Sequence, residues 1–368
     1  MYSETDIENA VATGAISAES AAALRESVAR ARATPLVDEE SFRLITGFND
    51  IFVSIAAVLL LVAVGWIGFS LIGPSDRMSE ADGARHLGLG IALGGLLVTG
   101  TSWGLAEYFT GRRRMALPSI ILLAAFVYGT GAGLFGFAMS IIGETHDERT
   151  IAAIAAGVGL LTAGAAFLHW RRFHVPITIA ALTAALVGTL IALLLWAVPA
   201  AKNSLLWMLL VAGIGVFAFA MWWDMSDRIR QTRRSDVAFW LHLAAAPMIA
   251  HPVFNLLGVM RNEADASTAL IVILLYIAFG IVALAVDRRA LLVSSLAYVL
   301  YALAGLFKQA GAVSLNIALT ALVIGSALLL LSAFWHHVRR IVVMALPDDL
   351  RTRLPELDRP ALGAARMA

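Results

Sequence analysis

The sequence contains no cysteine. This absence excludes disulfide bonds, thiolate nucleophiles and cysteine-ligated metals. Charged residues are scarce as well: they make up 14% of the chain, about half of the share found in soluble proteins. With 60% hydrophobic residues and a mean hydropathy of +0.82, the chain has too few polar side chains to cover a water-facing surface. Lipid is therefore predicted to surround most of the protein.

Motifs of known chemistry are also missing. The sequence contains no H-E-x-x-H zinc motif, no G-x-S-x-G nucleophile elbow and no phosphate-binding P-loop. The stretch Gly131–Gly136 matches the dinucleotide fingerprint G-x-G-x-x-G, but it lies in an apolar segment with no preceding strand. The net charge of +1 gives no indication of a nucleic-acid partner. We therefore expect a protein that is not an enzyme, binds no cofactor and binds no nucleic acid.

What the chain has is a series of apolar stretches, each close to the ~20 residues that a helix needs to cross a bilayer. The first begins near Ile51, and its length is too great for the apolar part of a signal peptide, so it is expected to stay in the membrane. The predicted fold is an all-α polytopic membrane protein with about ten transmembrane helices. We place them at 50–72, 87–109, 116–142, 150–170, 175–199, 205–223, 237–260, 269–286, 290–308 and 313–335.

The charges of the connections predict the orientation. Eleven arginines follow the second, fourth, sixth and eighth spans: Arg112, Arg113, Arg114, Arg171, Arg172, Arg228, Arg230, Arg233, Arg234, Arg288 and Arg289. The five other connections carry only six basic residues: Arg77, Arg85, Arg149, Lys202, Arg261 and Lys308. Because basic loops stay in the cytoplasm, both termini are expected there. Arginine pairs also recur along these connections, which indicates either duplicated helix pairs or simply basic inner turns.

Residues 1–34 are predicted to form a small cytosolic helical hairpin. Thr5 and Glu8 match a capping box, Gly14 can end the first helix, and Ser17 can cap the second. Its apolar core is too small for independent stability, so it needs a partner surface or the membrane. Two interpretations stay open: the hairpin binds a cytosolic protein, or it is a plain anchor or folding cap.

The remaining boundaries follow from composition. Residues 35–49 are expected to form an interfacial helix and linker, and residues 50–335 the transmembrane bundle. Residues 336–368 read as a cytosolic tail with several prolines, which would form at most a short docked helix.

The seventh span is the most polar of the ten. Counted from Asp236 at 1.5 Å per residue, its two histidines lie ~9 Å and ~22 Å along the helix. Prolines free backbone carbonyls one turn earlier, and many transporters build a mid-membrane site from such carbonyls. One interpretation is a polar path through the membrane; the other is hydrogen bonding to neighbouring helices, with prolines that only kink the helix. The residues concerned are His242, His251, Asn255, Pro247 and Pro252.

The loop that enters this span combines acidic residues with four arginines. It fits an anionic lipid headgroup, or a docking site for the N-terminal hairpin; the alternative is a basic turn that only sets topology. The candidate residues are Arg228, Arg230, Arg233, Arg234 and Asp236.

Other polar or small residues give weaker signals. Glu107, close to Arg112–Arg114, suits an interfacial ion pair better than a proton relay. Asn316 can hydrogen-bond between helices. The motifs Gly90-x-x-x-Gly94 and Gly129-x-x-x-Gly133 are typical of close helix packing.

Two stretches carry a resemblance. Residues 1–72, with GAISAES and DEESFRLITGFNDIF before a long span, resemble the start of an uncharacterised family of bacterial multi-pass membrane proteins. The segment DMSDRIRQTRRSDVAFWLHLAAAPMIAHP resembles alphaproteobacterial members of that family. The resemblance implies a cytosolic hairpin before eight to ten spans and a bacterial inner-membrane location, and it implies no site.

Two functions are therefore expected. The first is transport or conduction of a small solute, ion or proton through a path near residues 242–255. The second is a non-enzymatic scaffold, sensor or assembly factor that binds a cytosolic partner through residues 1–34. A lipid-modifying enzyme ranks third because no catalytic set of residues is visible.

Overall fold

The computed structural model describes residues 7, 10–24, 48–75, 78–143, 147–228, 230, 232–257, 266–309 and 316–357. The chain divides into two units, residues 1–42 with 356–368, and residues 43–355. Every regular element of the described residues is a helix, which confirms the all-α prediction. In the smaller unit, residues 10–12 and 18–24 are helical. The Ser17 hydroxyl accepts a hydrogen bond from the Ser20 N–H at 3.0 Å, and Gly14 has a φ of +72°, so both predicted helix ends are confirmed. The predicted Thr5 cap and residues 35–47 of the interfacial helix expected at 35–49 lie outside the described residues, and residues 48 and 49 belong to the first long helix.

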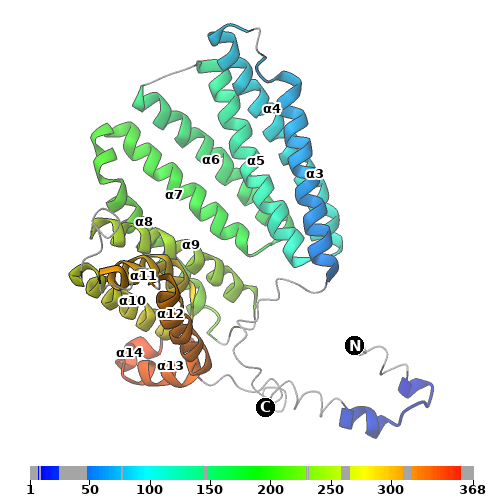
Figure 1. The fold of residues 1–368 in the computed structure, drawn as a ribbon. Helices are drawn as coiled ribbons and strands as arrows, with labels where there is room; N and C mark the ends of the chain where they lie inside the picture. The colour runs from blue at the N-terminus through cyan, green and yellow to red at the C-terminus, as the bar shows by residue number, and fades with distance from the viewer. Residues whose placement is uncertain are drawn as a thin grey trace. The chain divides into compact units, whose positions relative to one another are not determined.

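Each of the ten predicted spans contains a helix (Figure 1). Seven of the described helices, α3 to α9, are long and apolar enough to cross a membrane. α12 and the following α13 (Trp335–Met344) would together make an eighth spanning segment, with an angle of 74° between the two helices. The described apolar parts of α10 and α11 are shorter, at Leu270–Val286 and Leu292–Tyr301. The bounds are α3 Phe48–Ile72, α4 Glu80–Ala106, α5 Ala116–Ile142, α6 Glu148–Phe173, α7 Ile177–Ala197, α8 Leu205–Met225, α9 Arg233–Leu256, α10 Ala266–Val286, α11 Ala290–Gln309 and α12 Asn316–Ala333.

Shorter elements join or follow these helices. A π-helical turn, Glu107–Arg112, extends α4, and a 3₁₀ turn, Pro199–Ser204, precedes α8. α13 and the one-turn α14 (Asp348–Arg351) follow the last long helix.

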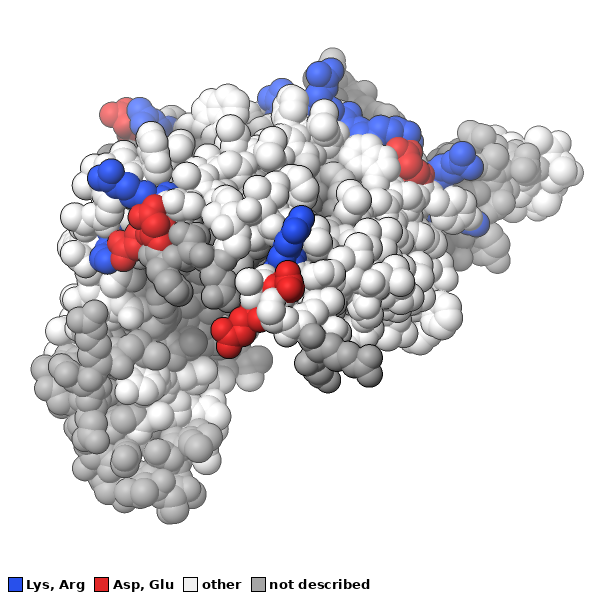
Figure 2. Space-filling view, turned by 90° about the horizontal axis from the view of Figure 1, so that it is seen from above, with Lys and Arg blue, Asp and Glu red and all other residues white. Residues whose placement is uncertain are grey.

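Large apolar side chains point outward along the helices. Leu59, Val62 and Trp66 of α3, for example, are each exposed by 66–69%. In Figure 2 the described surface is mostly white, and the charged residues on it form a few small groups. Soluble proteins rarely expose contiguous apolar surface of this kind, so these side chains are suited to contact with lipid.

Neighbouring helices in the sequence form hairpins. The pairs α4–α5, α6–α7, α8–α9 and α10–α11 are the main packing partners along the chain after α3. Each turn within these hairpins contains one non-glycine residue with a positive φ: Arg114, His174, Arg230 and Asp287. Left-handed backbone is uncommon for such residues. The turns differ in length, so this one backbone feature, rather than a whole turn geometry, recurs with the two-helix period that the arginine pairs indicate.

Glycines bring α3, α4 and α5 into close contact. A Cβ atom added at Gly94 would lie 2.7 Å from a backbone carbonyl of α3. A Cβ atom at Gly95 would lie 2.4 Å from the Gly133 backbone nitrogen and 2.6 Å from the Gly129 carbonyl oxygen in α5. No real side chain fits at such distances, so the helices touch backbone to backbone. The close packing predicted for the Gly90 to Gly94 and Gly129 to Gly133 motifs is confirmed.

α9 is the central helix of the second half of the bundle. It packs against α7, α8 and α11. Half of the residues in its apolar stretch are buried, compared with 17–28% in the six other helices that are long enough to span a membrane. The seventh predicted span therefore lies inside protein along much of its length, while its neighbours face outward.

Candidate functional site

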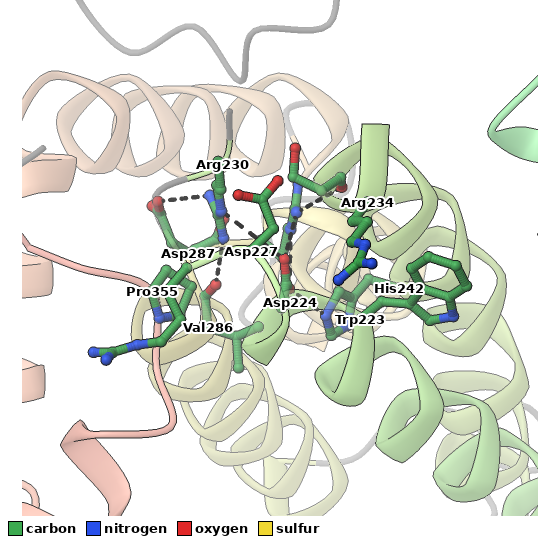
Figure 3. Close-up of polar contacts among 12 residues, drawn as sticks. Trp223, Asp224, Asp227, Arg230, Arg234, His242, Val286, Asp287 and Pro355 are labelled. Atoms are coloured by element: carbon green, nitrogen blue, oxygen red, sulfur yellow. Dashed lines mark hydrogen bonds and ion pairs between the residues drawn. The ribbon is translucent and has the colours of Figure 1, made fainter. Parts of the chain in front are cut away.

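Six charged or titratable side chains converge at one end of α8, α9, α11 and α13. Figure 3 labels four of them, Asp224, Arg230, His242 and Asp287. We call the six side chains the arginine–aspartate cluster. They come from the end of α8, the loop before α9, α9 itself, the turn between α10 and α11, and α13. The cluster consists of Asp224, Arg230, His242, Asp287, Arg288 and Arg339.

Asp224 is the centre of the first half of the cluster, and its side chain is fully buried. Arg288 Nη2 donates to Asp224 Oδ1 at 2.7 Å and also to the Ser235 carbonyl at 2.9 Å. On the other side, His242 Nε2 donates to Asp224 Oδ2 at 2.9 Å. Arg230 Nε lies 4.0 Å from Asp224 Oδ1. One carboxylate is therefore shared by two guanidinium groups and an imidazole, away from water.

Asp287 is the centre of the second half. Arg230 Nη1 donates to Asp287 Oδ2 at 2.9 Å, and the Trp335 indole N–H donates to Asp287 Oδ1 at 2.8 Å. Arg339 Nε lies 3.6 Å from the same oxygen, and Arg339 Nη2 donates to the Pro355 carbonyl at 2.7 Å. The network thus runs from α8 and α9 through the α10–α11 turn to α13 and the segment after α14.

The positions of the two aspartates explain why cations gather here. Asp224 lies in the last turn of α8, and Asp287 directly follows α10. A negative charge is unfavourable at a helix C-terminus, where the helix dipole is also negative. Arg230, Arg288 and Arg339 supply the compensating charge. The sequence signal for this cluster was an acidic residue at the end of each of two predicted spans. The sequence analysis selected His242, Arg230 and the other residues of the loop before α9, but neither aspartate.

The remaining polar residues of α9 form a second, smaller contact. Tyr298 of α11 lies with its hydroxyl 2.8 Å from His251 Nδ1. Asn255 Nδ2 donates to the His251 carbonyl at 2.9 Å, which confirms that the two residues share a face. The Phe254 ring stacks on Tyr298 with centroids 4.4 Å apart. Both histidines of α9 therefore bond to neighbouring helices, and His251 is also exposed.

The prolines do not break α9. The helix is continuous from Arg233 to Leu256 with Pro247 and Pro252 inside it. Pro252 is buried and Pro247 is exposed. The polar groups of α9 are therefore presented by an unbroken helix.

No protein-family model, curated protein or solved structure matches the chain. The geometry of the cluster is therefore the main evidence on function. Within the described parts of the chain, no three His, Asp or Glu side chains are grouped to hold a metal ion.

The loop before α9 is tied to the rest of the bundle. The Arg230 side chain is only 6% exposed, and Arg228 Nε donates to the Leu354 carbonyl at 3.0 Å. Arg233 and Arg234 are exposed, and Asp236 is half-buried. In the described residues, the loop holds the segment after α14, while its role toward a lipid headgroup or the N-terminal hairpin stays a prediction.

The weaker candidates have separate surroundings. Glu107 pairs with Arg172 at the end of α6, at 2.6 Å, rather than with the nearer arginines Arg112–Arg114. The side chain of Asn316 lies outside the described residues. His169, which sequence analysis did not select, is fully buried among the rings of Trp103 and Phe126 and that of Phe173. Neither of its ring nitrogens has a hydrogen-bond partner among the described residues, so it reads as a core residue.

Proposed function

We propose that the chain is an integral protein of the bacterial inner membrane, with ten spans and both termini in the cytoplasm, as in the family it resembles. The ten helices and the basic alternate connections support this topology. Ion pairs support it too. Glu107 and Arg172 join the ends of the second and fourth spans, and Lys202 and Glu148 join the connections after the fifth and third. In each pair, both partners belong to the same predicted side.

The cysteine-free sequence allows a direct test of the topology. Single-cysteine variants Lys202→Cys, Asn262→Cys, Arg234→Cys and Arg340→Cys would be treated with a membrane-impermeant maleimide in intact spheroplasts. We expect labelling of Lys202→Cys and Asn262→Cys, and labelling of the two arginine positions only after lysis. Labelling of Arg340→Cys in intact cells would mean an odd number of spans before it and would contradict the ten-span topology.

We further propose that the protein conducts protons through the membrane along α9. The observation that carries this proposal is the buried contact between His242 and Asp224. Ionisable groups inside a membrane protein are costly and commonly mark proton relays. Histidine is the side chain whose charge changes near neutral pH, and here it contacts a carboxylate that arginines also bind.

The geometry gives this contact a consequence for the helices. When His242 is neutral, its N–H donates to Asp224 while Arg288 provides the counter-charge. A proton on His242 adds a third positive charge around one carboxylate, which weakens the hold of the arginines on it. Because Arg230 and Arg288 link α8 and α9 to the α10–α11 turn, protonation changes the contact between the two hairpins.

The second polar contact lies further along the same helix. His251 follows His242 by nine residues, or ~13 Å of helix. The residues between them, 243–250, have no polar side chain, and three alanines, Ala244–Ala246, leave the helix surface small there. A proton path along α9 therefore requires water to enter beside these alanines in a second conformation, which is what alternating access would provide.

Proton flux tests the proposal. Purified full-length protein would be reconstituted into vesicles that contain the pH dye pyranine, and a potassium diffusion potential would be applied. We expect vesicles with the wild-type protein to acidify faster than protein-free vesicles. The acidification rate with His242→Gln or His251→Ala should fall to that of protein-free vesicles. His174→Asn is the matched control, because His174 is an exposed histidine in a turn and Asn tolerates its left-handed backbone. A wild type that conducts no more than protein-free vesicles would exclude the proposal.

A second candidate function is a scaffold, sensor or assembly factor. The separation of residues 1–42, with 356–368, from the bundle favours it, because a distinct cytosolic unit is suited to binding another protein. Deletion of residues 1–34 should then remove a protein that co-purifies with the full-length chain and leave the bundle monodisperse in detergent. If nothing co-purifies with the full-length chain, this candidate fails.

A further inference from the structure

The segment after α13 is attached to the arginine–aspartate cluster and to the loop before α9 through two consecutive residues. Arg228 Nε, in that loop, donates to the Leu354 carbonyl at 3.0 Å. Arg339 Nη2, in α13, donates to the Pro355 carbonyl at 2.7 Å, and Figure 3 shows Pro355 next to the cluster. We call residues 346–355 the C-terminal strap. The strap therefore links two parts of the chain that the cluster also joins.

The C-terminal strap is attached at its two ends and exposed between them. Before it, α13 is held in the bundle by the buried side chains of Trp335 and Val343. Every residue from Pro347 to Arg353 is exposed. At the far end, Leu354 and Pro355 are buried. Among the described contacts, two hydrogen bonds and two apolar side chains hold this far end, and segments with so few buried contacts are the ones that open locally.

The hydrogen bonds of the strap are made through backbone carbonyls. Water also accepts hydrogen bonds from a guanidinium, so it can replace these carbonyls when the strap leaves Arg228 and Arg339. Asp287, 3.6 Å from Arg339 Nε, is not part of the strap and stays with the cluster. Opening of the strap therefore changes the water content of the cluster and leaves its charge balance as it was.

The cluster next to the strap is closed to water. The Arg339 side chain is 3% exposed and the Arg230 side chain 6% exposed, and Asp224 is fully buried. Contacts connect these groups in order, since Arg339 lies 3.6 Å from Asp287, which accepts a hydrogen bond from Arg230. Arg230 in turn lies 4.0 Å from Asp224, the partner of His242. Water that enters at Arg339 therefore has a polar route to His242.

We infer that the C-terminal strap is a gate for the proton path along α9. When its far end leaves Arg228 and Arg339, water enters the cluster and reaches the contact between Asp224 and His242. The strap is closed in this structure, so the conducting state is the less populated one. The inference rests on the proposed proton conduction and adds the regulation of that path.

Opening of the strap can be measured separately from proton flux because the chain contains no cysteine. Leu354→Cys places a single thiol at the buried end of the strap, and its rate of reaction with a water-soluble disulfide reagent reports opening in the purified full-length protein. Adding Arg228→Gln should raise this rate about tenfold. That factor corresponds to ~1.4 kcal/mol, close to the weakest hydrogen bonds of charged groups. Arg234→Gln, at an exposed arginine of the same loop, is the matched control and should leave the rate unchanged.

Proton flux then shows whether the strap is the gate. In the pyranine vesicles, Arg228→Gln should raise the acidification rate above that of the wild type by the same factor as the labelling rate, because both rates depend on the population of the open strap. Leu354→Ala weakens the far end of the strap without a change of charge, and it should raise the acidification rate as well. Arg234→Gln should keep the wild-type rate.

Each outcome separates the gate from the proton conduction on which it rests. Faster labelling of Arg228→Gln with wild-type flux would overturn the gate and leave proton conduction standing. Equal increases in Arg228→Gln and Arg234→Gln would show an effect of the loop charge and would overturn the gate too. If Arg228→Gln does not fold, wild-type flux in Leu354→Ala overturns the gate by itself. A wild type that conducts no more than protein-free vesicles would exclude the proposed function, and the gate with it.

Discussion

The Asp224→Asn variant is expected to lose about 3 to 5 kcal/mol of unfolding free energy, the usual cost of removing one partner of a buried ion pair. The Asp224 side chain is fully buried, so solvent does not screen the loss. Without its charge, Arg288 loses its 2.7 Å partner, while Arg230 keeps its bond to Asp287. The measurement is the midpoint of thermal unfolding of the detergent-purified protein.

A double-mutant cycle makes this expectation specific to the ion pair. Arg288→Gln added to Asp224→Asn should cost less than the sum of the two single changes, because the second change removes the unpaired charge that the first one created. Asp147→Asn is the control: Asp147 accepts a hydrogen bond from the Thr150 N–H as the N-cap of α6, and Asn caps a helix equally well. Additive single and double changes would show that Asp224 and Arg288 do not act as a pair.

The Gly95→Ala variant is expected to be the other severe one. The added methyl group would lie 2.4 Å from the Gly133 backbone nitrogen, and a backbone atom cannot rotate away as a side chain can. Overpacking a well-packed site typically costs about 1 to 3 kcal/mol, and a clash with backbone belongs at or above the upper end of that range. We expect a lower unfolding midpoint, and loss of the close contact between α4 and α5.

The same helix supplies the control for this change. Gly104, also in α4, has no atom within 4 Å of an added Cβ. Gly104→Ala should leave stability unchanged or raise it, since alanine is favoured over glycine in a helix by ~1 kcal/mol. Equal unfolding midpoints for Gly95→Ala and Gly104→Ala would contradict the backbone-to-backbone packing of α4 and α5.

Helix positions could be predicted from the sequence because hydropathy is a local property. The predicted span 116–142 has the bounds of α5, and the prediction for α8 ends two residues early. It was also predictable that the helices carrying Gly90, Gly94, Gly129 and Gly133 would pack closely, because glycines four residues apart lie on one helix face. Both signals depend only on residues within a few turns of each other.

Partners across helices could not be predicted in this way, because they depend on how each helix is rotated. The ion pair expected for Glu107 is present, but its partner is Arg172, 65 residues away, rather than one of the nearby Arg112–Arg114. Likewise, Asp224 and Arg288 are separated by 64 residues, and no local pattern connects them.

The α12–α13 corner shows a further limit. Trp335 was predicted as the last residue of the tenth span, whereas it is the first residue of α13, which makes an angle of 74° with α12. The sequence W-H-H-V-R-R changes from apolar to amphipathic there, but hydropathy alone does not give the direction of the chain. Its bond to Asp287, 48 residues away, positions that corner.

The repeated helical hairpins have a consequence for how such a chain can change its length. In the proposed topology each hairpin leaves the bilayer on the side from which it entered, so gaining or losing a whole hairpin would preserve the sidedness of everything downstream. Gaining or losing a single helix would invert every later segment and carry the arginines of later turns to the wrong compartment. The turns that contain Arg114, His174, Arg230 and Asp287 lie inside the hairpins, so the natural breakpoints of this architecture are the connections between one hairpin and the next. Length variation should therefore be tolerated in pairs of helices and opposed in odd numbers.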